Sequence, residues 1–224
     1  MQIRSTNKPN FGLTNLSMKI IVIAEVAMQK EFESKGIPEG IEIHFETSLS
    51  TTPALGDAYF YLLEEVELKD PIDWLEQTNA PVFINAVIST LNILPANAIR
   101  INGWPGFIQR SLVEICTSKE NTSSADKVLK ALNWNNEIVP DVAGMIAPKI
   151  ISMIINEAYF ALSDDVSDKA AINTAMRLGT NYPYGPFEWS EIIGLPKIHH
   201  LLSTLSLTDP RYEPAPLLLK EIAQ

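Results

Sequence analysis

Residues 18–24 read Met-Lys-Ile-Ile-Val-Ile-Ala, and this apolar stretch decides the fold class. A continuous run of apolar, mostly β-branched residues is typical of a strand that is buried on both faces of a sheet. Residues 26–35 follow at once as a short helix, and Gly36 stands where helices commonly end. A strand that leads directly into a helix predicts an α/β layer, in which parallel strands are joined by right-handed crossovers.

The same alternation continues through the first two thirds of the chain. Further strands are expected over residues 41–45, 58–63, 81–84, 99–101, 112–115 and 136–139, and further helices over 72–77 and 124–132. The strand pattern then disappears, and helices are expected over 145–162, 167–178, 187–193 and 196–205. The helix over 145–162 is apolar on nearly every side, which favours burial in a core or in a subunit interface.

Composition excludes several classes of protein. The chain has 224 residues, 46% of them hydrophobic, and a net charge of −10, which suits a globular domain and argues against phosphate-backbone binding by nucleic-acid readers. Cys116 is the single cysteine, so a disulfide framework and a multi-cysteine zinc site are excluded. The longest early apolar run is far shorter than the roughly 20 residues that a membrane-spanning helix needs. We therefore expect a cytoplasmic protein that binds neither nucleic acid nor membrane.

The last third carries a family resemblance. Residues 179–189 read Gly-Thr-Asn-Tyr-Pro-Tyr-Gly-Pro-Phe-Glu-Trp, and residues 209–218 read Asp-Pro-Arg-Tyr-Glu-Pro-Ala-Pro-Leu-Leu. Together they resemble the C-terminal domain of 3-hydroxyacyl-CoA dehydrogenases, in particular the short-chain 3-hydroxybutyryl-CoA members. The resemblance covers residues 142–224 specifically. It is weaker earlier, at Leu-Val-Glu-Ile over 112–115 and at Asn85.

The resemblance implies a fold and a domain division. Residues 1–17 are expected to form a loose N-terminal arm, with either Met1 or Met18 as the start. Residues 18–141 would form a truncated, Rossmann-like parallel sheet domain. Residues 142–224 would form an all-α C-terminal domain, and we expect a homodimer through it.

The resemblance also implies a chemistry, in which a hydride moves from the 3-hydroxyl carbon to NAD⁺. In this family a His acts as general base and a Glu orients it. The family's Glu corresponds to Glu114, and the His should lie about a dozen residues earlier. Asn102 stands twelve residues before Glu114, and the chain's histidines are His44, His199 and His200. The general base is therefore expected to be missing.

Other departures concern the cofactor and the substrate. The family's glycine fingerprint is replaced by Ala-Glu-Val-Ala-Met-Gln over 24–29, which places side chains and the Glu25 carboxylate where a pyrophosphate would approach. Pro148 stands where the family has a polar Asn, and Ile84 precedes Asn85 where the family has Ser. The family's helical arm, which contributes to CoA binding, has no room between residues 45 and 58.

Two interpretations remain open. In the first, the chain has lost NAD-dependent catalysis, needs no cofactor, and acts as a non-catalytic binding or dimeric interaction protein, with an acyl-CoA-like molecule as a candidate ligand. Glu114 and Asn85 would then be remnants of the catalytic site, and Glu114 a satisfied polar residue at a strand end. In the second, the chain is an active NAD-dependent 3-hydroxyacyl-CoA dehydrogenase with an atypical site, using Glu114 with Asn85 or Asn102. Cys116 is expected to be a small core residue, and His199 and His200 to have surface or packing roles.

Overall fold

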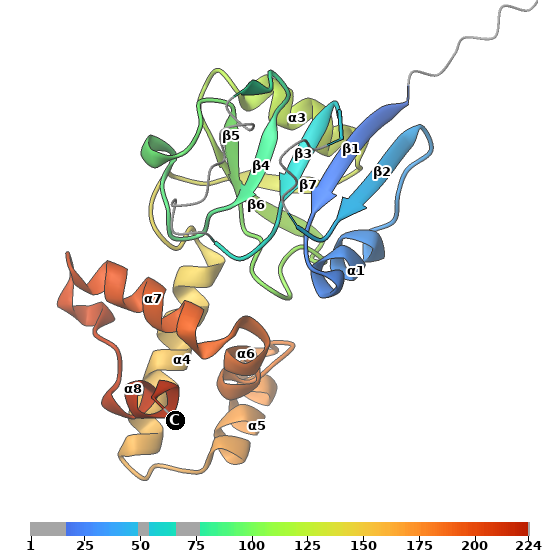
Figure 1. Cartoon of the computed structure of the whole chain (residues 1–224). Helices are drawn as coiled ribbons and strands as arrows, with labels where there is room; N and C mark the ends of the chain where they lie inside the picture. The colour runs from blue at the N-terminus through green and yellow to red at the C-terminus, as the bar shows by residue number, and fades with distance from the viewer. Residues whose placement is uncertain (1–16, 49–53, 66–76, 224) are drawn as a thin grey trace, which may run out of the picture.

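The computed structural model describes residues 17–48, 54–65 and 77–223. The expected N-terminal arm, apart from residue 17, and the expected helix over 72–77, apart from residue 77, lie outside the described residues. The described chain forms a sheet layer followed by a group of helices, and α4 leads from one to the other (Figure 1).

The sheet is Rossmann-like, and most of its strands are parallel. Its described strands are β1 (Met18–Ile23), β2 (Ile41–Glu46), β3 (Ala58–Tyr61), β4 (Val82–Asn85), β5 (Ala98–Ile101), β6 (Leu112–Thr117) and β7 (Asn135–Ile138), in the spatial order β2-β1-β3-β4-β5-β6-β7. The described helices of this layer are α1 (Val26–Ser34), the 3₁₀ turn η1 (Leu91–Ile93) and α3 (Thr122–Ala131). The chain passes from β1 to β2 on one side and then returns to β3 on the other. This creates a topological switch point beside β1, where open α/β sheets commonly bind ligands.

The expectation of an entirely parallel layer was wrong for one pair of strands. β5 and β6 are antiparallel, with Ile101 opposite Ile115. Residues 102–111 connect them without a helix, and a parallel crossover needs a dozen or more residues. The remaining described neighbours in the sheet pair in parallel, as expected.

The first strand is buried on both faces, as its sequence predicts. Residues 20–24 have no exposed surface. Ile20 and Val22 pack in the cluster that contains Phe32 of α1, whereas Ile21 and Ile23 belong to a second cluster on the other face. β1 therefore fixes the position of the α1 N-terminus, which follows it directly.

The last third is helical. The described helices are α4 (Ala147–Ser163), α5 (Lys169–Thr180), α6 (Pro186–Ile193), α7 (Leu195–Ser206), the 3₁₀ turn η2 (Pro210–Tyr212) and α8 (Pro216–Ile222). The expected start at Met145 was wrong by two residues, because Gly144 and Met145 both adopt a left-handed backbone that an α-helix cannot contain. The single chain leaves part of α4 uncovered, because Ile150 keeps 50% of its surface exposed, and burial of this helix in a subunit interface stays a prediction.

The ends of α5 differ from the expected ones. The helix starts two residues after the expected start at 167, and Asp168 caps it, where the Asp168 carboxylate accepts a hydrogen bond from the Ala171 N–H at 2.8 Å. It ends two residues after the expected end at 178, and Asn181 takes the left-handed position after it, with φ of 56°. Asn adopts this conformation more readily than other side chains, because its short amide can bond locally.

The turn between α5 and α6 has a structural role. The Asn173 side-chain oxygen accepts a hydrogen bond from the Phe187 N–H at 2.9 Å. A Cβ atom on Gly185 would lie only 2.4 Å from the Asn173 Cα, so only glycine permits this approach. The Tyr-Gly-Pro stretch at 184–186 therefore docks α6 against α5.

A buried arginine joins the sheet to the start of the helical part. Arg100 of β5 has no exposed surface. Its guanidinium donates to the carbonyl oxygens of Ala86 at 2.8 Å, Val87 at 3.0 Å and Val142 at 3.1 Å. It also pairs with the Asp141 carboxylate at 2.5 Å. Arg100 thereby holds the loop after β4 next to the segment before α4.

Candidate functional site

The two residues expected to be remnants of a catalytic site face different hollows. A crevice of about 110 Å³ at the switch point is lined by Asn85 and Gly103 among others. A larger pocket of about 350 Å³ is lined by Asn102 and Glu114. The two hollows share no lining residue. The structure therefore does not bring Asn85 and Glu114 into one cavity.

Glu114 of β6 holds the start of α4. One carboxylate oxygen accepts a hydrogen bond from the Ala147 N–H at 2.8 Å, and the other accepts from the Ile146 N–H at 3.4 Å. Burial raises the pKa of Glu114, while these two bonds and the Asn102 side chain act in the opposite direction. Glu114 thus satisfies backbone donors at a helix start, where a negative charge is favourable.

Asn102 occupies the position twelve residues before Glu114 and lies against it. The Asn102 N–H donates to the Glu114 carbonyl oxygen at 3.0 Å, and its side-chain oxygen accepts from the Trp104 N–H at 3.4 Å. Asn102 is 2% exposed, so this arrangement is internal. A carboxamide neither gains nor loses a proton near neutral pH, so Asn102 cannot serve as a general base.

Asn85 ends β4 and is almost completely buried. Its side-chain N–H₂ donates to the Leu63 carbonyl oxygen at 3.0 Å. Among the described residues, its side-chain oxygen has no hydrogen-bond partner. A Cβ atom on Gly103 would lie 2.9 Å from that oxygen, so the backbone of the loop after β5 covers it closely.

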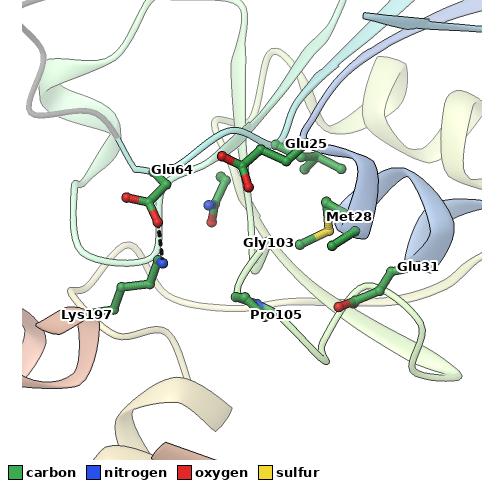
Figure 2. A pocket seen from close by; sticks show the side chains of 10 residues that line it. Glu25, Met28, Glu31, Glu64, Gly103, Pro105 and Lys197 are labelled. Carbon is green, nitrogen blue, oxygen red and sulfur yellow. Dashed lines mark hydrogen bonds and ion pairs between the residues drawn. The ribbon is translucent and has the colours of Figure 1, made fainter. Parts of the chain in front are cut away.

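The crevice at the start of α1 is acidic. Glu25 and Glu31 line it from α1 and the residue before it, and Glu64 lines it after β3 (Figure 2). Lys197 of α7 also reaches it, but the Lys197 ammonium is engaged with the Glu64 carboxylate at 2.6 Å. Glu31 accepts a hydrogen bond from the Gly106 N–H at 2.8 Å, and burial raises its pKa.

A glutamine side chain joins the residue after β1 to the end of β2. Gln29, at the third glycine position of the replaced fingerprint, donates to the carbonyl oxygens of Ala24 at 2.7 Å and Glu46 at 3.3 Å. The Glu46 carboxylate, which ends β2 where an acidic residue can bind a ribose, accepts from the Ala54 N–H at 3.4 Å. With Glu25 at the α1 N-terminus, these residues do not fit a pyrophosphate and its ribose.

Several residues of this region could not be found from the sequence. Glu64 and Lys197 are 133 positions apart, and no local pattern pairs them. Arg100 and Arg110 lie in short segments with no periodicity that would mark them as central. The spacing between Asn102 and Glu114, in contrast, was a usable signal, because it matched the family's spacing.

The remaining candidates have structural roles. Cys116 is buried beside Asp141, and burial raises the pKa of its thiol. His199 hydrogen-bonds Ser203 within α7 at 3.1 Å, and no histidine lines either hollow. No group of three or more His, Cys, Asp or Glu side chains in the described part of the chain is placed to hold a metal ion.

The described helices include none with the length and apolar character that crossing a membrane requires.

Comparison with known proteins identifies the helical part. The sequence profile of the 3-hydroxyacyl-CoA dehydrogenase C-terminal domain matches residues 144–223. Residues 144–223 therefore form a domain of the 3-hydroxyacyl-CoA dehydrogenase family. The matching profile ends one residue before the last, so it covers nearly all of the helices after the sheet.

Individual relatives agree. The chain is 44% identical over 113 residues to the 3-hydroxyadipyl-CoA dehydrogenase of Escherichia coli strain K12, covering 48% of this chain and 24% of that protein. It is 28% identical over 169 residues to a 3-hydroxybutyryl-CoA dehydrogenase of Clostridioides difficile, covering 73% of this chain and 59% of that protein. The chain thus spans less than two thirds of either relative.

A solved structure supports the fold of the whole described chain. The crystal structure of (S)-3-hydroxybutyryl-CoA dehydrogenase from Ralstonia eutropha superposes with a TM-score of 0.67, covering 92% of this chain and 94% of that chain. The sequence identity is 18%, so this likeness concerns the fold alone. It agrees with a Rossmann-like sheet followed by a helical domain.

Proposed function

We propose that this chain is a non-catalytic member of the 3-hydroxyacyl-CoA dehydrogenase family, which acts as a binding or dimeric interaction protein. The observation that carries this proposal is the contact of Asn102 with Glu114, whose carbonyl oxygen accepts from the Asn102 N–H at 3.0 Å. The family's His–Glu pair has the same spacing, but here a carboxamide stands at the position of the base. A Glu that lies beside a carboxamide, and whose oxygens accept from two backbone N–H groups, has no proton acceptor to orient.

The cofactor crevice supports the same proposal. Catalysis in this family requires a dinucleotide with two negative phosphate groups. The side chains of Glu25 and Glu31 line the crevice, and its volume of about 110 Å³ is well below the 300–1,000 Å³ typical of ligand pockets. We therefore propose that the chain does not use NAD⁺. We further propose that it works in the cytoplasm, where its one cysteine would stay reduced.

The first prediction concerns activity and cofactor binding. Purified protein is expected to form no NADH from NAD⁺ and a 3-hydroxyacyl-CoA, and millimolar NAD⁺ is expected to leave its melting temperature unchanged. A ligand present far above its Kd must stabilise the folded state, so thermal unfolding measures this directly. Acetoacetyl-CoA, titrated separately in the same assay, tests whether an acyl-CoA-like ligand binds without the cofactor.

The variants Asn102→His and Glu114→Gln separate the two interpretations. Because the cofactor crevice does not fit NAD⁺, Asn102→His alone is expected to remain inactive. NADH formation by the unmodified protein, abolished in Glu114→Gln, would establish the active alternative with an atypical site and overturn the proposal. A catalytically active family member serves as the positive control for the assay.

The helical part also supports the proposal of a homodimer. None of the residues of α5 is buried in the single chain, although the helix carries Ile172 and Met176. An apolar hollow of about 220 Å³ lies between α5, α4 and α6, lined by these two side chains together with Ile154 and Pro186. Leu178, near the end of α5, is 82% exposed. An unburied apolar helix of this kind is typical of an interface with a second subunit.

The second prediction tests this interface. Light scattering at micromolar concentration is expected to give the mass of a dimer, and Leu178→Glu is expected to shift the protein toward monomer. Leu207→Glu is the matched control, because Leu207 is 85% exposed but directly follows α7 rather than lying in α5. A monomer for the unmodified protein, or equal effects of both variants, would argue against an α5 interface.

A further inference from the structure

The larger of the two hollows near the sheet–helix junction has the dimensions of a small-molecule site. It encloses about 350 Å³, within the usual range for ligand pockets. Its walls come from the connection between β5 and β6, the first residues of β6 and the first residue of α4. It lies apart from the acidic crevice at the switch point, and its lining includes a positive charge rather than a set of carboxylates.

That charge is the guanidinium of Arg110, and it is held in place without being neutralised. The guanidinium carbon lies 5.2 Å from the Phe107 ring centre and 5.7 Å from that of Trp189. The Arg110 carbonyl oxygen accepts a hydrogen bond from the Lys35 ammonium, which fixes its backbone. Within residues 17–48, 54–65 and 77–223, no group accepts a hydrogen bond from its guanidinium. Arg110 therefore offers positioned, unpaired donors to the pocket.

The carboxylate in the same pocket does not use these donors. The oxygens of Glu114 are already bonded to the N–H groups of Ile146 and Ala147 at the start of α4. Its charge still acts on Arg110 at longer range. The pocket thus contains one guanidinium without a hydrogen-bond acceptor among the described residues and one carboxylate whose hydrogen bonds are satisfied. A ligand with one negative charge can pair with the guanidinium, whereas a second negative charge would be repelled by the carboxylate.

The other lining residues indicate which groups a ligand would need besides its negative charge. The hydroxyl of Ser111 has no hydrogen-bond partner among the described residues and can add a donor next to Arg110. Leu112, which is 49% exposed, and Ala147 provide an apolar wall. A guanidinium matches the planar geometry of a carboxylate with two parallel hydrogen bonds.

We infer that this pocket binds a free monocarboxylate with a short apolar chain, its carboxylate on Arg110 and Ser111 and its chain against Leu112 and Ala147. A phosphate group could also bind Arg110, but its second negative charge would face Glu114. This inference does not depend on the proposed loss of catalysis, because neither NAD⁺ nor a CoA thioester takes part.

Hexanoate is a suitable probe, with hexanol and inorganic phosphate as comparison ligands. Hexanoate is expected to bind saturably at millimolar concentration in ligand-observed NMR. Arg110→Gln should weaken binding about tenfold or more, because hydrogen bonds to a charged group are lost. Lys119→Gln removes the same charge from an exposed site beyond the other end of β6, and it should leave the affinity unchanged. Hexanol, which lacks the charge, and phosphate should both bind more weakly than hexanoate.

Backbone amide shifts of the unmodified protein provide a readout that does not depend on the folding of any variant. Hexanoate should shift the amide signals of Ser111, Leu112 and Ala147 and leave those around Glu25 and Glu31 unchanged. Four results would overturn the inference: no binding at millimolar hexanoate, shifts confined to other regions, equal weakening by both variants, or tighter binding of phosphate than of hexanoate.

Discussion

Replacing Arg100 by methionine is expected to lower the free energy of unfolding by about 3–5 kcal/mol, because three carbonyl oxygens lose a charged hydrogen-bond donor. The guanidinium satisfies three carbonyl oxygens and pairs with Asp141 while fully buried. Methionine fills part of the same volume but donates no hydrogen bond. The three carbonyl oxygens would then be left without these partners, and each unsatisfied buried polar group carries its own penalty.

Urea denaturation monitored by tryptophan fluorescence measures this effect. Arg177→Met provides the matched control, because Arg177 pairs with Glu188 at 3.0 Å and both side chains are partly exposed. An exposed pair of this kind contributes about 0–1 kcal/mol. Similar losses for the two variants would show that the Arg100 network does not hold the loop after β4 to the segment before α4.

Local patterns in the sequence predicted most of the fold. The apolar run over 20–24 predicted a strand buried on both faces, and its burial is complete. The helix after it, the strands up to β7, and α6 and α7 lie within a few residues of their expected bounds. These elements could be predicted because the hydrophobic periodicity of a strand or helix, and the residues that end a helix, are visible in a short stretch of sequence.

The predictions were wrong where the structure depends on residues far apart in the sequence or on an unusual backbone conformation. The antiparallel pairing of β6 depends on the length and conformation of 102–111, which strand patterns do not encode. The start of α4 depends on two left-handed residues, of which Met145 has no sequence signature for that conformation.

The candidate site was predictable in part. The spacing from Asn102 to Glu114 pointed to two residues that the structure places in contact. Asn85, in contrast, lines another hollow, because it ends β4 on the side of the switch point. No pattern in the sequence marked Arg110 as a site residue. Its proposed role depends on contacts with two aromatic rings, one of them in α6, and on the absence of a hydrogen-bond partner for its guanidinium among the described residues.

Removing the Glu114 carboxylate is expected to have the second largest effect on stability. Glu114→Ala should lower the free energy of unfolding by about 2–3 kcal/mol at neutral pH, because the Ala147 and Ile146 N–H groups lose a charged acceptor. Glu33→Ala is the control, since Glu33 is an exposed residue of α1.

The pH dependence of stability tests the electrostatic part of this argument. Burial raises the pKa of Glu114 above its ordinary value of 4.5, so the folded protein holds this proton more tightly than the unfolded chain does. The part of the stability that depends on a protonated Glu114 is therefore fully present below pH 4.5 and is lost as the pH rises through the folded pKa, whereas the hydrogen bonds to the start of α4 remain at neutral pH. Glu31 and Glu65, whose pKa values burial also raises, act in the same direction.

Glu114→Gln keeps an oxygen acceptor and removes the ionisation, so its stability should fall less steeply over this pH range than that of the unmodified protein. The charged neighbours of Glu114 are the same in both proteins. Arg110 favours the charged form of Glu114, and Glu137 lies opposite Glu114 on β7. Chemical denaturation at a series of pH values from mildly acidic to neutral measures the two slopes. Glu33→Gln should retain the slope of the unmodified protein. Identical slopes for Glu114→Gln and Glu33→Gln would mean that burial does not raise the pKa of Glu114. Another carboxylate would then cause the pH dependence.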